Sequence, residues 1–194
     1  MHDDPTVIER TRQWLEHAVI GLNLCPFAKA VYVKQQVRYA VSHARHLDAF
    51  LDELEAELRR LADADPAELD TTLLIHPALF DDFDTFVDLI AAAEGVLADA
   101  GLEGTLQLAH FHPRYVFEGS DADDLGNCTN RAPYPTLHLL REASIARAAA
   151  AFPDPAAIYQ RNIDLLHRMG HDGWAALARQ WEAPEQPGEA PESG

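Results

Sequence analysis

The sequence predicts a small layered α/β domain, with a three-stranded sheet flanked by helices and a helical C-terminal part. Segments of strand character alternate with segments of helical periodicity as far as Phe111. The run Thr71–Ile75 is apolar along almost its whole length, which is typical of a strand covered on both faces. Right-handed crossovers between neighbouring strands would make the sheet parallel, and a split, ferredoxin-like sheet is the alternative.

The first part of the chain predicts two helices separated by a strand. Apolar residues recur at helical spacing after Pro5, so we expect a first helix that ends near Gly21. The alternating segment Val37–Ser42 indicates a strand. Between Leu47 and Leu61, apolar residues gather on one helical face and acidic residues on the other, which indicates an amphipathic helix with a solvated acidic side.

The second part of the chain predicts further helices around one more strand. A helix from about Asp82 to Ala100 should end at Gly101, because glycine readily adopts the left-handed conformation of a helix C-terminus. The remaining expected elements are a strand over 105–111, an irregular stretch over 113–135, and helices over 137–151, 156–169 and 173–181.

The length of 194 residues suits one sizeable hydrophobic core. We therefore expect a single α/β domain over residues 1–182. Residues 183–194 are rich in glutamate, proline and glycine, and such a composition cannot bury apolar surface. We expect this segment to be a disordered acidic tail.

Charge and composition exclude several classes of partner. The formal net charge of -17 repels phosphate backbones and anionic lipid surfaces, so we expect neither nucleic acid nor membrane binding. No apolar stretch approaches the roughly 20 residues that span a bilayer, and no secretory signal begins the chain, so a cytoplasmic location is expected. Cys25 and Cys128 form no Cys-x-x-Cys pair, which disfavours zinc bound by thiolates.

A histidine follows each predicted strand: His43, His76 and His112. The carboxyl ends of parallel strands meet at one edge of a sheet, so these imidazoles would share that edge. The alternative is that each ring merely ends its strand and bonds to a loop carbonyl. His76, His110 and His112 could also supply nitrogen ligands to zinc or iron, but their spacing matches no metal motif and we assign no metal site.

The segment Asn127–Glu142 is dense in hydrogen-bonding side chains. We expect a helix to begin near Thr136, which would place His138, Arg141 and Glu142 on one face. The N-terminus of that helix, together with Arg131 and Arg141, would suit a carboxylate or a phosphate. The alternative is structural: Arg141 and Glu142 form a surface charge pair, while Asn127, Asn130 and Arg131 tie the loop to the domain.

Cys25 lies beside Pro26, near the expected end of the first helix. A thiolate there would face the less favourable end of the helix dipole, so a buried structural cysteine between Leu24 and Phe27 competes with a reactive thiol. We keep Cys25 as a possible functional thiol.

Three segments also carry a family resemblance: Leu24–Ala28, Phe111–Pro113 and Thr129–Glu142, with Arg161–Ile163 near the end of the chain. Together they resemble a bacterial family of proteins of unknown function, DUF1415. The resemblance covers essentially the whole folded chain and implies one single-domain unit. It implies no reaction, because no activity is established for that family.

Motifs of serine hydrolases, nucleotide triphosphatases and dinucleotide enzymes are absent from the sequence. The leading hypothesis is therefore a small-molecule enzyme in which His112 and His138 act as general acid and base on an anionic substrate. The residues expected to bind that substrate are Asn127, Asn130, Arg131, Tyr134, Arg141 and Glu142. The alternatives are a non-catalytic module that binds a small ligand or a partner, and a metal-dependent protein that uses histidines. The sequence assigns no cofactor and no oligomeric state.

Overall fold

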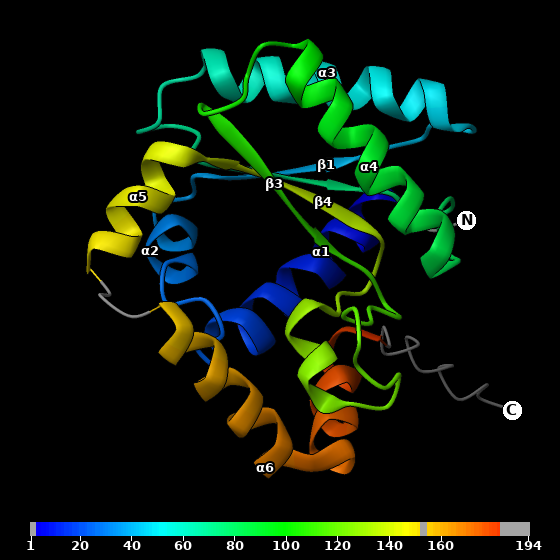
Figure 1. Cartoon of the computed structure of the whole chain (residues 1–194), viewed down its shortest axis with the longest axis vertical. Helices are drawn as coiled ribbons and strands as arrows, with labels where there is room; N and C mark the ends of the chain where they lie inside the picture. Colours follow the sequence, from blue (N-terminus) through cyan, green and yellow to red (C-terminus); the bar gives the residue numbers. More distant parts are fainter. Residues whose placement is uncertain (1–2, 152–154, 183–194) are drawn as a thin grey trace, which may run out of the picture.

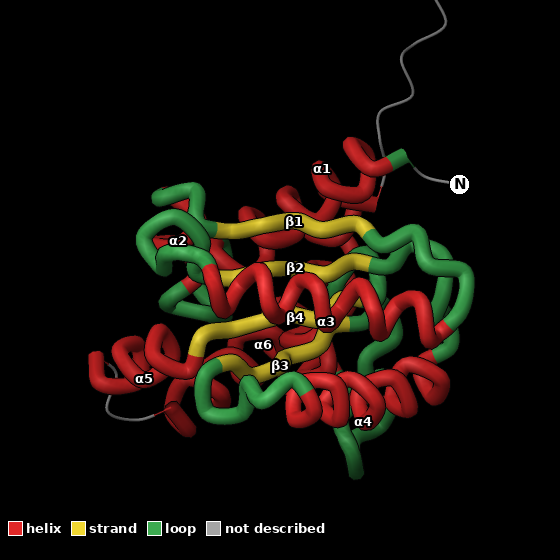
Figure 2. Tube along the Cα trace, turned by 90° about the horizontal axis from the view of Figure 1, so that it is seen from above, coloured by secondary structure: helices red, strands yellow, loops and turns green. Residues whose placement is uncertain are grey.

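The computed structural model describes residues 3–151 and 155–182, and its centre is a four-stranded mixed sheet with helices around it (Figure 1). The strand order is β1-β2-β4-β3 (Figure 2). β1 (Val37–Val41) is parallel to β2 (Thr71–Ile75). β4 (Thr136–Arg141) lies between β2 and β3 (Leu106–Phe111) and is antiparallel to both. The strands β1, β2 and β3 therefore share one direction, and their carboxyl ends lie at the same edge of the sheet.

Two helices, α3 (Leu47–Asp63) and α4 (Phe83–Asp99), cover one face of the sheet (Figure 2). His46 accepts a hydrogen bond from the Ala49 amide at the start of α3, and Asp82 does the same for Thr85 at the start of α4. The apolar faces of both helices pack onto the sheet. The buried residues of this main core include Phe50, Leu54, Leu58, Leu74, Phe86, Leu89, Leu137 and Leu139.

The other face of the sheet meets the N-terminal helices. α1 (Asp4–Trp14) passes without a break into a π-helical turn, η1 (Leu15–Ile20), and a short helix, α2 (Ala28–Val33), follows. Trp14 packs edge-on against Phe111 of β3, with the ring centroids 5.1 Å apart. This second cluster of buried residues also contains Trp181, near the end of the chain that the structure describes.

The C-terminal part of the chain is helical, as expected. α5 (Glu142–Ala151) follows β4 without an intervening loop, and the Glu142 amide donates to the Thr105 carbonyl over 3.0 Å. α6 (Pro155–Glu182) packs against α1 and against a 3-10 helical turn, η2 (Leu125–Asn130). Gly170, with φ of 71°, interrupts α6. The expected disordered tail, residues 183–194, lies outside the described residues.

The structure corrects the expected helix over 137–151, whose first part is strand β4. Residues Leu137 and Leu139 face the main core, while His138 and Leu140 face the opposite side of the sheet. A strand that is buried on both faces resembles a short apolar helix in sequence, so the pattern alone did not separate them. The sheet therefore has four strands, and His138 shares no helical face with Arg141 or Glu142.

Candidate functional site

A cavity of about 310 Å³ lies between the sheet and the helices α1, η1, α2 and α5. All four strands contribute to its wall, through Val37, Leu73, Phe111 and Leu140. The helical side of the wall is also mainly apolar and comprises Trp14, Leu15, Val19, Phe27, Ala28, Val31, Ile145 and Ala148. The polar side chains in the lining are few: Cys25, Asp70, Thr71, His138 and Ser144. Such a cavity resembles the concave, mostly apolar sites that bind small molecules.

His138 lies on β4, and its Nε2 atom is 2.7 Å from the Thr71 hydroxyl of β2. The two residues are diagonal neighbours on the same face, because Thr71 pairs with Leu140 in the register of the two strands. The Thr71 hydroxyl also donates to the Leu139 carbonyl over 2.7 Å. Since that hydroxyl has one proton, it accepts from the His138 ring, and the ring carries its own proton on Nε2.

The same geometry leaves Nδ1 of His138 as a hydrogen-bond acceptor. No other side chain or amide in the described part of the chain donates to it. Burial lowers the pKa of His138 to about 4, so the ring is neutral at physiological pH. The cavity therefore presents one neutral acceptor in a wall that is otherwise almost entirely apolar.

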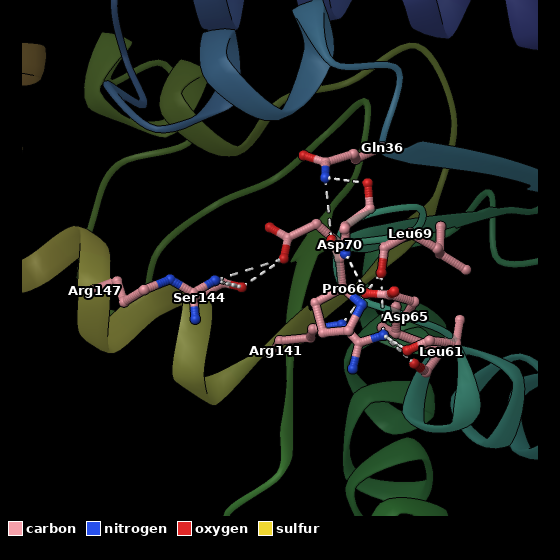
Figure 3. Close-up of polar contacts among 11 residues, drawn as sticks. Gln36, Leu61, Asp65, Pro66, Leu69, Asp70, Arg141, Ser144 and Arg147 are labelled. Carbon is pink, nitrogen blue, oxygen red and sulfur yellow. Dashed lines mark hydrogen bonds and ion pairs between the residues drawn. The ribbon is translucent and has the colours of Figure 1, made fainter.

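The rim of the cavity is polar (Figure 3). The Ser144 hydroxyl donates to Asp70 over 2.6 Å, and Arg147 donates to the Ser144 oxygen over 2.9 Å. An outer hollow of about 510 Å³ shares Asp70, Ser144 and Ala148 with the cavity and adds Lys34 to the lining. The outer hollow therefore adjoins the cavity between α2 and α5, and both helices contribute residues to its lining.

Arg141 and Glu142 do not line this cavity. The buried Arg141 guanidinium donates to the carbonyl groups of Leu61, Ala64 and Leu69, on the α3 side of the sheet (Figure 3). Glu142 is the first residue of α5. The expected anion site at a helix N-terminus beside Arg131 and Arg141 is therefore not assembled here.

His76 and His112 follow β2 and β3 at the same edge of the sheet, as expected from the strand directions. Both rings are buried and use both nitrogens. His76 donates to the Ala44 carbonyl over 2.9 Å and accepts from the Leu79 amide over 2.7 Å. His112 bonds in the same manner to the Phe80 carbonyl, over 2.8 Å, and to the Arg114 amide, over 3.0 Å.

The two histidines expected to act together lie on opposite sides of the sheet. The His112 ring packs against Phe83 and Phe86 of α4, whereas His138 faces the cavity on the α1 side. Burial also lowers the pKa of His112. His43, after β1, is exposed and lies 3.0 Å from Asp4. The shared edge therefore does not bring the three rings into one pocket.

The loop residues of the polar segment mainly hold the backbone. Asn127 is fully buried, accepts from the Phe117 amide and donates to the Asp121 carbonyl. Asn130 donates to the His110 carbonyl over 3.1 Å. Arg131 donates to the Tyr115 and Ala122 carbonyls, and the Tyr134 hydroxyl accepts from Arg10. These contacts match the structural alternative stated for the loop.

The metal hypothesis finds no cluster in the described ranges. His110 bonds to the Tyr115 hydroxyl at 3.1 Å and stacks on that ring, while His76 and His112 are occupied by backbone groups. No group of three or more histidine, cysteine, aspartate or glutamate side chains within residues 3–151 and 155–182 is arranged to hold a metal ion.

The two cysteines are free and occupy different surroundings. Cys25 is partly buried and lines the cavity. Cys128 is buried between Leu125 and Leu166, and burial raises the pKa of its thiol. Of the polar residues expected to be functional, only Cys25 and His138 reach the cavity. Sequence reasoning missed Thr71, which could be found only from the register of β2 against β4.

No helix in the described part of the chain combines the length and the apolar composition needed to cross a membrane. Comparison with curated proteins and with solved structures finds no significant match. A family model described as "Protein of unknown function (DUF1415)" matches residues 6–176. All three segments of the family resemblance contribute to the cavity wall, through residues such as Cys25, Phe111 and His138. The match covers most of the sequence, and the chain therefore belongs to the DUF1415 family.

Proposed function

We propose that this protein binds a small, largely apolar molecule in the cavity, and that His138 accepts a hydrogen bond from a hydroxyl or N–H group of that molecule. One observation carries the proposal: Thr71 occupies Nε2 of the ring, and Nδ1 is left as an acceptor in an apolar wall. Apolar contact would supply most of the affinity, and the single polar contact would orient the ligand.

Catalysis by His138 is the second candidate, because a neutral imidazole with a free nitrogen can act as a general base. A general base works best when its pKa lies near the working pH, and burial lowers the pKa of His138 to about 4. The ring is therefore a good acceptor but a weak base at neutral pH, which favours binding over proton abstraction. Catalysis by His138 would give a rate that falls only below about pH 4.

A pair of probes that differ by one hydroxyl group tests the proposal. 2-Naphthol can donate to His138, whereas naphthalene cannot, and calorimetry would measure the affinity of each. We expect 2-naphthol to bind about fivefold more tightly, because one hydrogen bond contributes about 1 kcal/mol. His138→Leu should abolish this difference while both probes still bind. An equal preference for 2-naphthol in that variant would contradict the role of His138.

A matched pair of variants on α5 tests the location. Ala148 lines the cavity, so Ala148→Phe should fill it and weaken both probes by at least tenfold. The neighbouring Ala149 is exposed and does not line the cavity, so Ala149→Phe should leave both affinities unchanged. Binding that is equally strong in both variants would place the site elsewhere.

A further inference from the structure

We infer that a second hollow, lined by Arg10 of α1 and Arg131 after η2, binds a small anion with a carboxylate or phosphate group. Its volume is about 270 Å³, and it shares no lining residue with the His138 cavity. The remaining lining residues are Pro113, Ala132, Pro133, Trp174, Ala178, Trp181 and Glu182. The inference is independent of the proposed function.

Arg10 carries a positive charge that no carboxylate of the described residues balances at ion-pair distance. One of its terminal nitrogens, Nη1, donates to the neutral Tyr134 hydroxyl over 3.3 Å. Its Nε atom is buried and has no hydrogen-bond partner among the residues that the structure describes. Within the described ranges, no carboxylate lies within 4.0 Å of its guanidinium. A buried donor on a charged group is costly to leave unpaired, and such a group commonly marks the place of an ion or ligand.

Arg131 is held in place by neutral acceptors. Its Nε and Nη2 atoms donate to the Tyr115 and Ala122 carbonyls, and Nη1 lies 3.8 Å from the Cys128 sulfur. The backbone of Arg131 is fixed as well, because its carbonyl accepts from the Trp14 indole over 2.9 Å. These contacts orient the guanidinium without neutralising it. An anion would therefore meet a group that is already positioned, which lowers the entropy cost of binding.

The charge around the hollow favours an anion over a cation. Glu182 is the carboxylate in its lining, and it forms no ion pair within 4.0 Å with either arginine in the part of the chain that the structure describes. Among the described lining residues, two cations against one anion give a net positive charge, in a chain of formal charge -17. Tryptophan and proline side chains form part of the wall beside the two arginines. Guanidinium groups also match carboxylate and phosphate oxygens in a bidentate manner.

Titration with inorganic phosphate and with succinate, against sodium chloride at equal ionic strength, tests the site. Trp174 and Trp181 line the hollow, so tryptophan fluorescence reports binding directly, and the melting temperature gives a second readout. We expect at least one of the two anions to change the fluorescence and raise the melting temperature, whereas chloride does neither. A wild-type protein that responds to none of them beyond the chloride control would overturn the inference.

Arg10→Gln is the decisive variant, and Arg12→Gln is its matched control on the same helix. Arg12 pairs with Glu9 and lies over the Tyr39 ring, outside the lining of the hollow, so its loss should not change the anion response. Loss of the charged donors of Arg10 should weaken anion binding by tenfold or more, and Arg10→Lys should restore part of it. Equal responses in Arg10→Gln and Arg12→Gln would also overturn the inference. Arg131 is less suitable for this test because it also supports its loop.

Ala148→Phe separates the two proposals. This variant should keep the full response to phosphate or succinate while it loses 2-naphthol binding, because the two hollows share no residues. Loss of the anion response in Ala148→Phe would contradict a separate anion site, even if the cavity proposal held.

Discussion

The Arg141 side chain donates hydrogen bonds to three backbone carbonyl groups. It reaches the carbonyl groups of Leu61 and Ala64 at the end of α3, and the Leu69 carbonyl before β2. The last carbonyl groups of a helix lack partners within the helix and carry partial negative charge, so a guanidinium suits them. A polar residue in a dense motif can thus be fully occupied by the fold.

Substitution of Arg141 should therefore reduce stability. We expect Arg141→Met to lower the free energy of unfolding by about 3 kcal/mol, because buried carbonyl groups lose a charged donor. Urea denaturation measures this loss. Arg147 is exposed on α5, with a side-chain accessibility of 67%, so Arg147→Met should change stability by less than about 0.5 kcal/mol. Similar losses in the two variants would contradict this role of Arg141.

At the scale of single residues, the sequence could identify which side chains are polar and close in the chain, but not what they contact. His138 and Cys25 were predicted as functional, and both line the cavity. Thr71, the hydrogen-bond partner of His138, was not predicted, because this contact depends on a strand register between residues far apart in sequence. Arg10 was not predicted as a site residue for the same reason, because its neighbours in the sequence do not indicate that it shares a hollow with Arg131.

At the scale of elements, β4 shows where sequence patterns are insufficient. The order of α1, β1, α3, β2, α4 and β3 followed from periodicity, and the structure has each of them within a few residues. β4 is flanked by β2 and β3 and buried on both faces, so its apolar residues do not alternate with polar ones. What makes it a strand is hydrogen bonding to two partners, which local periodicity does not report.

α6 offers a test of an element boundary. Gly170 adopts φ of 71° and ψ of 170°, a region that is almost restricted to glycine, and it divides the helix in two. An added Cβ would meet no atom within 4 Å, so Gly170→Ala should cost only backbone strain, about 2 kcal/mol. Gly95 lies inside α4 with equal space around it, and Gly95→Ala should stabilise by about 1 kcal/mol. Thermal unfolding would show opposite signs, and the same sign for both would contradict the assigned break.

At the scale of the whole molecule, buried histidines should make the fold sensitive to acid. Burial lowers the pKa of His76, His110, His112 and His138 in the folded protein. The unfolded chain then binds protons more readily than the folded chain. The stabilisation is therefore complete above the ordinary histidine pKa of about 6.5 and is lost as the pH falls below it.

Denaturation in urea at pH 7 and at pH 5 measures this dependence. We expect a lower free energy of unfolding at pH 5, where most carboxylates are still ionised and histidines dominate the change. For His138 alone, the shift to about 4 corresponds to about 3 kcal/mol once the pH has fallen to 4. His138→Leu should show a shallower decline than the wild type. A stability that is constant from pH 7 to pH 5 would be inconsistent with neutral buried rings.

The direct passage from β4 into α5 has a kinetic consequence for the cavity. α5 begins at the residue that directly follows the central strand β4, and its first amide donates a hydrogen bond to the Thr105 carbonyl. It therefore moves only as the sheet moves. α2, across the opening, is a short helix between connecting segments in which Asn23 and Gln35 have positive φ. The rates of ligand entry and release would therefore depend on movements of α2, while α5 forms the fixed side of the opening.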